Sequence, residues 1–463
     1  MIEVKLKSFE SLLSKAITKA KTTEYNQLVS MTEEIHEVDP VRFFASAKTL
    51  SMDRVFWTST SEQFSIVGVG CAWNIELEEN RTETIENHWQ QLVDEAIIDN
   101  PYQVPGTGVV GLGGMSFDPS VRKSSLWNKF SHRSFQVPNV LLTKHNARNY
   151  LTINLQVKAN DDLQELTEWV EQAKDILVNS SERLPECAGI AGQQEIAPDK
   201  WKQTVKLAAD KIKAHDAQKI VLARELRVTM TDDVQVASIL RNLLETQPDS
   251  YVFAVERAGD CFVGASPERL VKQDNNQLFS VCLAGTAPRG KTEAEDREIG
   301  ENLLHDDKNR SEHDFVVKMI RQSMEAYCDA VHVPETPVIH PFRNLQHLYT
   351  PVTAQLKRGY SIFDIIEKLH PTPALGGVPR EASKDFIRKH EQLDRGWYGA
   401  PVGWFDSNRN GEFAVAIRSG LVQGDKVSLF AGCGVVKDSD PEAEYEETMI
   451  KFRPMLSALE GRQ

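Results

Sequence analysis

The spacing of hydrophobic residues predicts both helices and strands in the first part of the chain. Apolar side chains recur at helical spacing in residues 84–98 and 161–178, which predicts two amphipathic helices packed on a core. Residues 65–73 are β-branched and glycine-rich, as expected of a buried strand. Residues 140–155 contain two further strand-like runs joined by a short turn. This region is therefore expected to mix strands with a few helices.

A longer series of elements is predicted after a helix that begins at Pro198. We expect the following order: strand 218–229, helix 233–246, strands 251–257, 261–265 and 278–284, helices 293–305, 311–331 and 361–369, strands 412–418 and 426–431, and helix 441–459. Strands that follow one another directly favour antiparallel pairing, with the helices outside the sheets. The predicted fold class is therefore α+β.

The best candidate for a linker is the segment 179–198, which is rich in Gly, Pro, Ser and Ala and has little periodicity. It separates an N-terminal α+β region, residues 1–180, from a C-terminal region, residues 199–459. We expect the two regions to form one intertwined globular unit.

Composition narrows the class of protein. The chain has 463 residues, of which 41% are hydrophobic and 26% charged, so it can bury a large core. A formal net charge of -14 argues against a nucleic-acid partner. It also means that a site for an anionic substrate must supply its own positive charge.

The sequence also indicates where the protein is expected to work. It contains no apolar run long enough to span a membrane, and its first ten residues lack the apolar core of a secretion signal. The six cysteines are scattered and form no CxxC pair, which is typical of buried thiols in a reducing compartment. We therefore expect a cytoplasmic protein with no membrane partner.

One glycine-rich motif matches the pattern of a dinucleotide-binding loop but lacks its structural context. Residues 106–111 satisfy GxGxxG, but a dinucleotide site needs a strand before this motif and a helix after it. Here a proline-flanked segment precedes the motif, and residues 113–119 cannot form a helix. We expect a glycine-rich turn and the start of a strand.

Two residues could exchange protons. Lys219 opens the apolar strand KIVLAR, and this segment alone favours a strand-end lysine that reaches solvent; if it were buried, its pKa would fall and the amine could act as a base. Glu268 follows a Ser-Pro turn at the tip of a strand. It is either a surface carboxylate or, if partly buried, an acid with a raised pKa that can donate a proton.

Carboxylates cluster near two helix starts. Glu312 lies at the start of one helix, while Glu444 and Glu447 lie one turn apart on another, ahead of Lys451. Acidic residues at helix starts are usually explained by their favourable interaction with the helix dipole, and Glu447 and Lys451 could form an i,i+4 salt bridge. The alternative is a divalent cation, and all-oxygen ligation with few protein ligands suits Mg²⁺.

Glycine-rich strand ends and one arginine could bind anions. Gly285 and Thr286 end one strand, and Gly432 and Gly434 end another. Backbone N–H groups in such turns can hold a carboxylate, and Arg418 could clamp another one. Each feature is weak alone, because glycine turns are usually only turns.

Taken together, these segments resemble a known family. KIVLAR, GASPERL, AGTAPRG, DKNRSEH, LQHL, HPTPALGG, YGAPVGW, EFAVAIR, AGCGVV and SDPEAEYEET occur in this order between about Trp201 and Lys451, and this series resembles the chorismate-utilising enzymes. The resemblance implies two large, mainly antiparallel sheets packed as a sandwich, with helices outside and chorismate bound by residues 199–459.

Departures within the family indicate the subtype. Aminodeoxychorismate synthases carry a nucleophilic lysine where this chain has Ala284, and anthranilate synthases usually have Gln where Lys219 stands. The N-terminal half also lacks the LLES-type feedback motif of anthranilate synthase, and no amidotransferase subunit is expected. FFASA, RVFWTS and GVGCAW resemble the long isochorismate synthases of menaquinone biosynthesis, in which water is the nucleophile.

The resemblance also implies roles for individual residues. Lys219 would activate water for attack at C2 of chorismate, and Glu268 would protonate the departing C4 hydroxyl. Glu312, Glu447 and Glu444 would hold Mg²⁺. The substrate-binding set would comprise His347, Lys451, Arg418, Gly285, Thr286, Gly432 and Gly434.

Rival functions remain at this point. A salicylate synthase would form isochorismate and then eliminate pyruvate, and a siderophore-pathway isochorismate synthase would share the same chemistry. A non-catalytic chorismate- or metal-binding protein is the most distant alternative. Retention of Lys219, Glu268 and the three glutamates argues against that last possibility.

Overall fold

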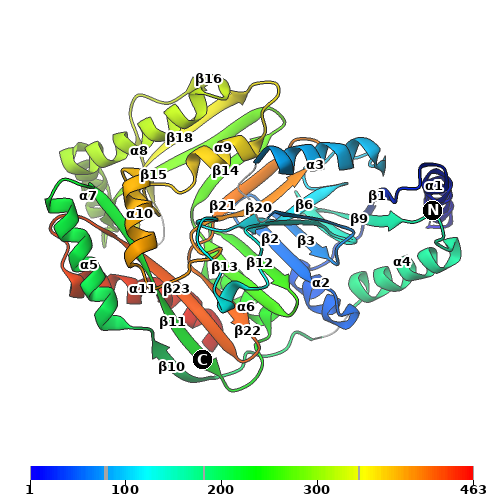
Figure 1. Cartoon of the computed structure of the whole chain (residues 1–463), viewed down its shortest axis with the longest axis horizontal. Coiled ribbons are helices and arrows are strands. Elements are labelled where there is room, and N and C mark those ends of the chain that lie inside the picture. The colour runs from blue at the N-terminus through cyan, green and yellow to red at the C-terminus, as the bar shows by residue number, and fades with distance from the viewer. Residues whose placement is uncertain (1, 78–81, 181–182, 342–344, 462–463) are drawn as a thin grey trace. The chain divides into compact units, whose positions relative to one another are not determined.

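The chain folds into two compact units in the computed structural model, which describes residues 2–77, 82–180, 183–341 and 345–461 (Figure 1). Unit 1 comprises residues 1–268, 371–408 and 414–463, and unit 2 comprises residues 269–370 and 409–413. The described residues form two large sheets, of 13 and 10 strands, together with 11 α-helices. The expected α+β fold class is thus confirmed.

The 13-stranded sheet lies in unit 1 and is antiparallel apart from the pair β1 and β5. Its order is β10 (Ile190–Glu195), β11 (Lys219–Met230), β23 (Lys426–Val435), β22 (Ser419–Gln423), β13 (Asp260–Ser266), β12 (Tyr251–Arg257), β2 (Arg54–Ser59), β3 (Phe64–Val69), β8 (Val140–His145), β9 (Arg148–Val157), β1 (Gln27–Ile35) and β5 (Ile97–Asp99), and β19 (Gly377–Val378) also pairs with β11. Strands distant in the sequence, such as β11 and β23, therefore lie side by side.

Both faces of this sheet are buried in unit 1. One face packs against helices through an aliphatic core that includes Leu13, Leu240 and Met455. The helices of unit 1 are α1 (Ile2–Thr23), α2 (Pro40–Ser46), α3 (Thr82–Glu95), α4 (Leu163–Val178), α5 (Pro198–Lys213), α6 (Val236–Thr246), α10 (Arg380–His390) and α11 (Pro441–Glu460).

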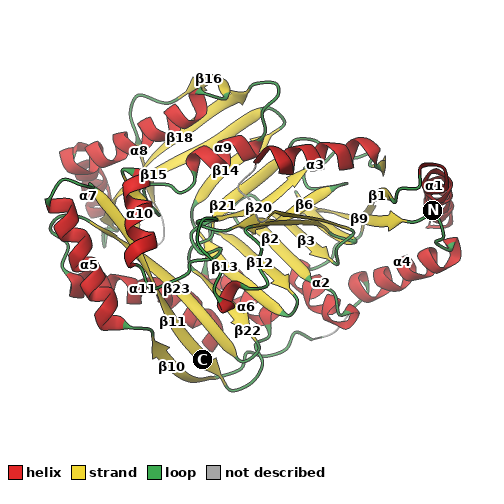
Figure 2. Cartoon of the chain, in the orientation of Figure 1, coloured by secondary structure: helices red, strands yellow, loops and turns green. Residues whose placement is uncertain are grey.

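The opposite face packs against strands of the second sheet. The strand order there is β20 (Pro401–Asp406), β6 (Val110–Met115), β7 (Arg133–Val137) and β4 (Trp73–Leu77). Aromatic side chains such as Trp57, Phe253 and Trp404 fill the core between these strands and the first sheet. Figure 2 distinguishes the helices, such as α4 and α5 of unit 1, from the strands of the sheets.

Unit 2 is built around a long antiparallel pair, β15 (Gln277–Pro288) and β18 (Leu345–Leu356). A bulge interrupts β15 between Ala284 and Thr286, where Gly285 adopts a φ of 80°. The other elements are β14 (Arg269–Asp274), β16 (Cys328–His332), β17 (Val338–Pro341), α7 (Glu293–His305), α8 (Asp307–Glu325) and α9 (Ile362–Leu369), and β21 (Gly411–Val415) begins in this unit.

Several sequence expectations need correction. The helix expected over 311–331 is α8, which ends at Glu325 and is followed by strand β16. Residues 190–195, within the expected linker, form the edge strand β10. The sequence analysis also did not anticipate α1.

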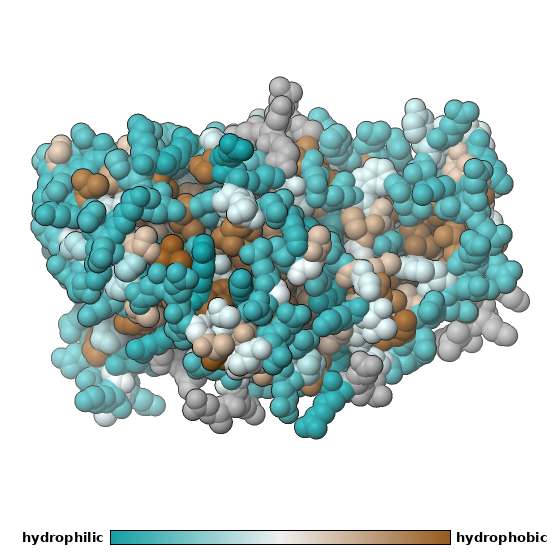
Figure 3. All heavy atoms as spheres, turned by 60° about the horizontal axis from the view of Figure 1, so that its bottom comes forward, coloured by the Kyte–Doolittle hydropathy of each residue, from teal (hydrophilic) through white to brown (hydrophobic). Residues whose placement is uncertain are grey.

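Other expectations are confirmed. The glycine-rich motif at 106–111 leads into strand β6 and not into a helix. All six cysteines are free and four are buried as expected, whereas Cys71 is exposed and Cys187 is only partly buried, so the expectation of buried thiols is wrong for these two. None of the helices in the described ranges combines the length and apolar character needed to cross a membrane. On the face drawn in Figure 3, hydrophilic residues dominate and apolar residues are interspersed among them.

Candidate functional site

Lys219 is the first residue of β11, and its backbone is held from both sides. Lys219 pairs with Val378 of β19, and its carbonyl accepts a hydrogen bond of 2.9 Å from the Ser383 hydroxyl. Its side chain is partly buried and runs close to Gly434 of β23. A Cβ at Gly434 would lie only 2.5 Å from the Lys219 Cε, so any side chain there would displace the end of the lysine.

Glu268 follows the end of β13, where its backbone is fixed at two atoms. Its N–H donates to the Ser266 hydroxyl at 3.2 Å, and its carbonyl accepts from Val415 N–H at 3.0 Å. Burial raises the pKa of the Glu268 carboxyl to about 7, although Arg418 and Lys219 act to lower it. A carboxyl with this pKa is protonated often enough near neutral pH to donate a proton.

Thr372 also faces this carboxyl. Its hydroxyl acts to lower the pKa of Glu268. The same buried oxygen, Oγ1, lies outside the geometry of a full hydrogen bond to any described residue. Its segment is held by turns in which Leu375 and Gly376 N–H donate to the Thr372 carbonyl. The sequence analysis quoted this motif but did not single out Thr372.

Arg418 acts electrostatically on Glu268, and its guanidinium can bind a carboxylate. It adopts a φ of 51°, and its carbonyl accepts a hydrogen bond of 3.1 Å from Ala265 N–H. Burial lowers its pKa, whereas Tyr398, Glu268 and Glu447 raise it by electrostatic attraction. The same burial raises the pKa of Tyr398 to about 12, so this phenol stays protonated and is a hydrogen-bond donor that the sequence analysis missed.

Helix α11 presents the two expected glutamates and a lysine. Asp440 caps the helix by accepting from the N–H groups of Glu442 and Ala443. Glu444 accepts from the Ser439 hydroxyl at 2.7 Å, and Glu447 pairs with Lys451 at 2.5 Å. The Glu447 side chain is 51% exposed, which leaves its carboxylate accessible to a ligand.

The glycines of β23 lie inside the strand and not in a terminal turn. Gly432 and Gly434 pair with Ala223 and Val221 of β11, and the Gly432 carbonyl accepts from the Lys451 ammonium at 2.8 Å. On the other side of β23, the pairing with β22 reaches only to Phe430. Backbone groups beyond Phe430 on that side are therefore not used by β22.

Unit 2 contains the remaining predicted residues. The Thr286 hydroxyl lies 2.9 Å from His347 Nδ1, across the β15–β18 pair. Burial lowers the pKa of His347, which favours the neutral imidazole. Glu312 is exposed on α8, and the next residue, His313, is fully buried.

His313 anchors α8 to the bulged strand β15. Its Nδ1 lies 3.0 Å from the Ala284 carbonyl, and its Nε2 lies 2.7 Å from the Thr350 hydroxyl. Nδ1–H therefore donates to the carbonyl and Nε2 accepts from the hydroxyl. This arrangement fixes Glu312 relative to the Gly285–Thr286 bulge within unit 2.

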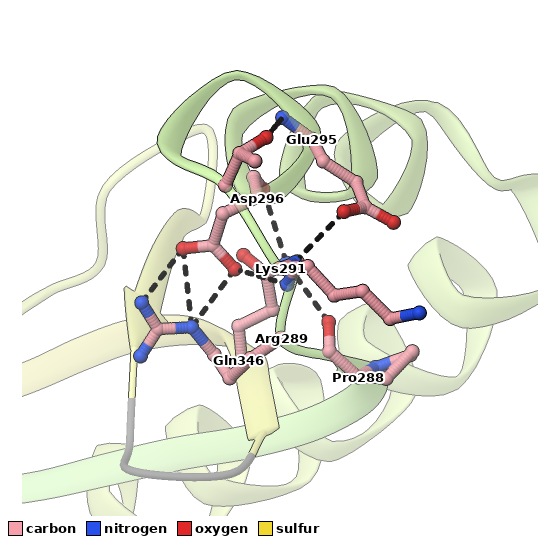
Figure 4. A network of polar contacts seen from close by, with 8 residues as sticks. Pro288, Arg289, Lys291, Glu295, Asp296 and Gln346 are labelled. Carbon is pink, nitrogen blue, oxygen red and sulfur yellow. Dashed lines mark hydrogen bonds and ion pairs between the residues drawn. The ribbon is translucent and has the colours of Figure 1, made fainter.

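A polar network holds the turn that follows β15 (Figure 4). The Arg289 guanidinium donates to both carboxylate oxygens of Asp296, and Gly290 N–H donates to the same carboxylate. Arg289 and the Gly290 N–H lower the pKa of Asp296 to about 2. Gln346 donates to the carbonyls of Pro288 and Asp296 at 3.2 Å each, so the turn is tied to β18.

The carboxylates suit Mg²⁺ in their chemistry. Within the part of the chain that the structure describes, no group of three or more His, Cys, Asp or Glu side chains is close enough to hold a metal ion. Mg²⁺, however, commonly uses one or two carboxylates and completes its shell with water and substrate. Glu444 and Glu447, one turn apart on α11, provide such oxygens.

Unit 1 thus brings eight of the twelve predicted site residues into one region. Lys219, Glu268, Arg418 and Glu447 are linked by their mutual electrostatic effects. Glu444, Lys451, Gly432 and Gly434 adjoin them on α11 and β23. Glu312, His347, Gly285 and Thr286 belong to unit 2.

Comparison with known proteins gives a match over nearly the whole chain. A family model described as chorismate binding enzyme matches residues 15–460. The chain is 41% identical over 470 aligned residues to isochorismate synthase MenF of Bacillus subtilis, with 100% of both chains covered. It is 33% identical to a salicylate biosynthesis isochorismate synthase of Pseudomonas aeruginosa, which covers 98% of this chain and 94% of the relative.

Solved structures support the same fold. The structure of MenF from Escherichia coli, a menaquinone-specific isochorismate synthase, matches with a TM-score of 0.79 at 24% identity and covers 96% of this chain and 99% of that one. A putative 2,3-dihydroxybenzoate-specific isochorismate synthase, DhbC from Bacillus anthracis, matches with a TM-score of 0.68 at 28% identity, covering 89% and 99%.

Proposed function

Because this chain belongs to the family of chorismate-binding enzymes, we propose that it is an isochorismate synthase that converts chorismate to isochorismate. The observation that carries the proposal is the full-length match to an isochorismate synthase at 41% identity. The pair of Lys219 and Glu268 in unit 1 supplies the two proton-transfer groups that this reaction needs. We further propose that the product feeds menaquinone synthesis.

The proposed reaction replaces one hydroxyl group by another. Lys219 takes a proton from water, and the water oxygen forms a bond to C2 of the ring. The ring double bonds shift, the C4–oxygen bond breaks, and Glu268 donates its proton to the departing hydroxyl, which leaves as water. The raised pKa of Glu268 supports the acid role, because an ionised carboxylate could not donate.

Cationic groups and backbone N–H groups would bind the substrate carboxylates. Arg418 and the backbone of Gly432 and Gly434 would take the pyruvyl carboxylate. Lys451 and, from unit 2, His347, Gly285 and Thr286 would complete the binding set. Local positive charge from Arg418 and Lys451 offsets a net charge of -14 that would otherwise repel a dianion.

Mg²⁺ is the proposed cofactor. Glu447 and Glu312 would be direct ligands, and Glu444 would act through a water molecule. When bound, the ion would supply positive charge against the ring carboxylate of the substrate. Displacement of Lys451 from Glu447 would free that carboxylate oxygen, and the exposure of Glu447 supports this exchange.

Product analysis tests the proposal. Purified protein is incubated with chorismate and Mg²⁺, and the mixture is separated by chromatography. We expect isochorismate, no product when EDTA replaces Mg²⁺, and at least about a 1,000-fold lower rate for Lys219→Ala with chorismate binding retained. Salicylate formed without any added lyase would instead identify a salicylate synthase, and a wild-type rate for Lys219→Ala would refute the base assignment.

A further inference from the structure

One stretch of β11 has no strand alongside it on one edge. β19 pairs only with Lys219 and Ile220, and β10 begins to pair at Leu226. Between them, Val221 N–H donates to the carbonyl of Gly376, just before β19, at 3.3 Å, whereas the Val221 carbonyl and both backbone groups of Ala223 are bound by side chains. This gap begins directly after Lys219, the proposed base.

Side chains fill the gap. Arg395 donates from Nη2 to the Val221 carbonyl at 2.8 Å, and Ala223 N–H donates to Glu391 Oε2 at 2.8 Å. The Trp201 indole donates to the Ala223 carbonyl at 3.0 Å. Two charged side chains and one indole therefore replace the missing strand, and the two hydrogen bonds to charged groups are stronger than backbone bonds.

Glu391 and Arg395 form a buried, bidentate ion pair. The Nε–Oε1 and Nη2–Oε2 distances are 2.6 and 2.7 Å, and the side chains are only 1% and 4% exposed. The guanidinium also lies 4.2 Å from the centre of the Phe117 ring. A buried pair of this kind seldom adds net stability over apolar packing, so its presence calls for another role.

The pair also reaches the segment beside the proposed acid. Arg395 Nη1 donates to the Leu375 carbonyl at 2.9 Å, and Leu375 belongs to the turn that holds Thr372 next to Glu268. One guanidinium thus binds the strand of Lys219 and the segment that faces Glu268. A shift of the pair would change the spacing between the two groups that transfer protons.

We propose that Glu391 and Arg395 are positioning residues for the reaction proposed above. They hold β11 and residues 371–376 in the relative placement that sets Lys219 against Glu268, without touching the substrate. The inference rests on the proposed function, because the spacing matters only if both groups act in one reaction. Misplacement by about 1 Å can lower a rate about 100-fold.

A one-carbon shortening tests this role. Glu391→Asp keeps the buried pair neutral overall, but the shorter side chain cannot reach both Arg395 and Ala223 N–H. The matched control is Glu256→Asp in the ion pair of Arg54 and Glu256, which is also bidentate at 2.6 and 2.9 Å, is 8% and 13% exposed, and joins β2 to β12. Circular dichroism establishes the folded fraction of each variant, and kcat and KM are measured at a temperature where both are folded.

We expect Glu391→Asp to lower kcat by 10- to 100-fold with KM for chorismate within threefold of wild type, and Glu256→Asp to leave both within twofold. An equal loss in the two variants, or a rise in KM alone, would overturn the inference. If Glu391→Asp does not fold, Arg395→Lys with Arg54→Lys as its control is judged by the same criteria. An inactive wild-type protein would instead refute the proposed function, which separates the two failures.

Discussion

The Lys219 side chain lies against Gly434, and this contact decides where the amine can be. Gly434 faces Val221 in the β11–β23 pairing, so it lies beside the path of the lysine. A Cβ there would be 2.5 Å from Cε and 3.2 Å from Nζ of Lys219. The absence of a side chain at Gly434 is therefore a condition for the observed lysine conformation.

Gly434→Ala is expected to displace the amine without unfolding the strand. Alanine fits a strand backbone, so we expect retained circular dichroism and a loss of kcat of at least about tenfold, because a base must lie within hydrogen-bonding reach of the proton that it removes. Gly192→Ala in β10 is the control, because nothing lies within 4 Å of a Cβ at that position. A wild-type kcat for Gly434→Ala would show that Lys219 can act from another conformation.

At the scale of single residues, the sequence predicted which residues belong to the candidate site better than it predicted the contacts that place them. The motif series located Lys219, Glu268 and Arg418, and the structure brings them into one region of unit 1. The contact between Lys219 and Gly434 depends on strands β11 and β23, which pair although they are more than 200 residues apart. The ion pair of Glu391 and Arg395 was likewise invisible, because its main partners are backbone groups on remote segments.

Arg224 joins the two elements that carry most of the proposed site, β11 and α11. Its Nε donates to the Thr448 hydroxyl at 2.7 Å, and its guanidinium lies 3.7 Å from the Tyr445 ring centre and 5.1 Å from that of Phe452. Both terminal nitrogens are buried without a hydrogen-bond partner. Burial lowers the pKa of Arg224, while electrostatic attraction to Tyr445 and Glu195 raises it, and the aromatic rings add cation–π contacts.

Arg224→Met is expected to loosen α11 on β11. Methionine fills much of the volume but loses the hydrogen bond and the aromatic contacts, a loss of about 1–3 kcal/mol that is partly offset by relief of the buried charge. We expect a lower melting temperature and a three- to tenfold rise in the Mg²⁺ concentration for half-maximal rate. Lys202→Met is the control: Lys202 lies 4.4 Å from the same ring centre, and its side chain is 27% exposed. Equal effects in both variants would contradict the proposed link.

Element boundaries show where local pattern stops being informative. The amphipathic pattern predicted one helix over 311–331, whereas α8 ends at Glu325 and Cys328–His332 pair with β18. Pairing along an existing strand outweighed helical spacing there. The polar segment 190–195 becomes strand β10 for the same reason, because β11 offers it an edge.

On the scale of the whole molecule, burial of the Glu268 carboxyl lowers the folding stability of the protein. Burial raises the pKa of Glu268 from an ordinary value near 4.5 to about 7. Between these two pH values the folded protein binds more protons at this group than the unfolded chain does. Stability therefore falls as the pH rises through this window, and the full penalty applies above about pH 7.

Glu268→Gln is expected to abolish this penalty along with the activity. Glutamine stays neutral, so the variant should melt near the wild-type temperature at pH 5 and a few degrees higher at pH 8, which corresponds to about 1–3 kcal/mol. Melting curves of both proteins across this pH range check the expectation. A difference that is the same at every pH would show that the Glu268 carboxyl is not desolvated.

The pairing of β11 with β23 also has a consequence for folding during translation. β11 ends at Met230 and β23 begins at Lys426, so about 200 residues are synthesised between them. At about 5–20 residues per second, the apolar strand that carries Lys219 waits roughly 10–40 s on the ribosome before its neighbour exists. The unpaired apolar strand is open to aggregation during this interval, and the strand that carries the proposed base gains its neighbour β23 only near the end of translation.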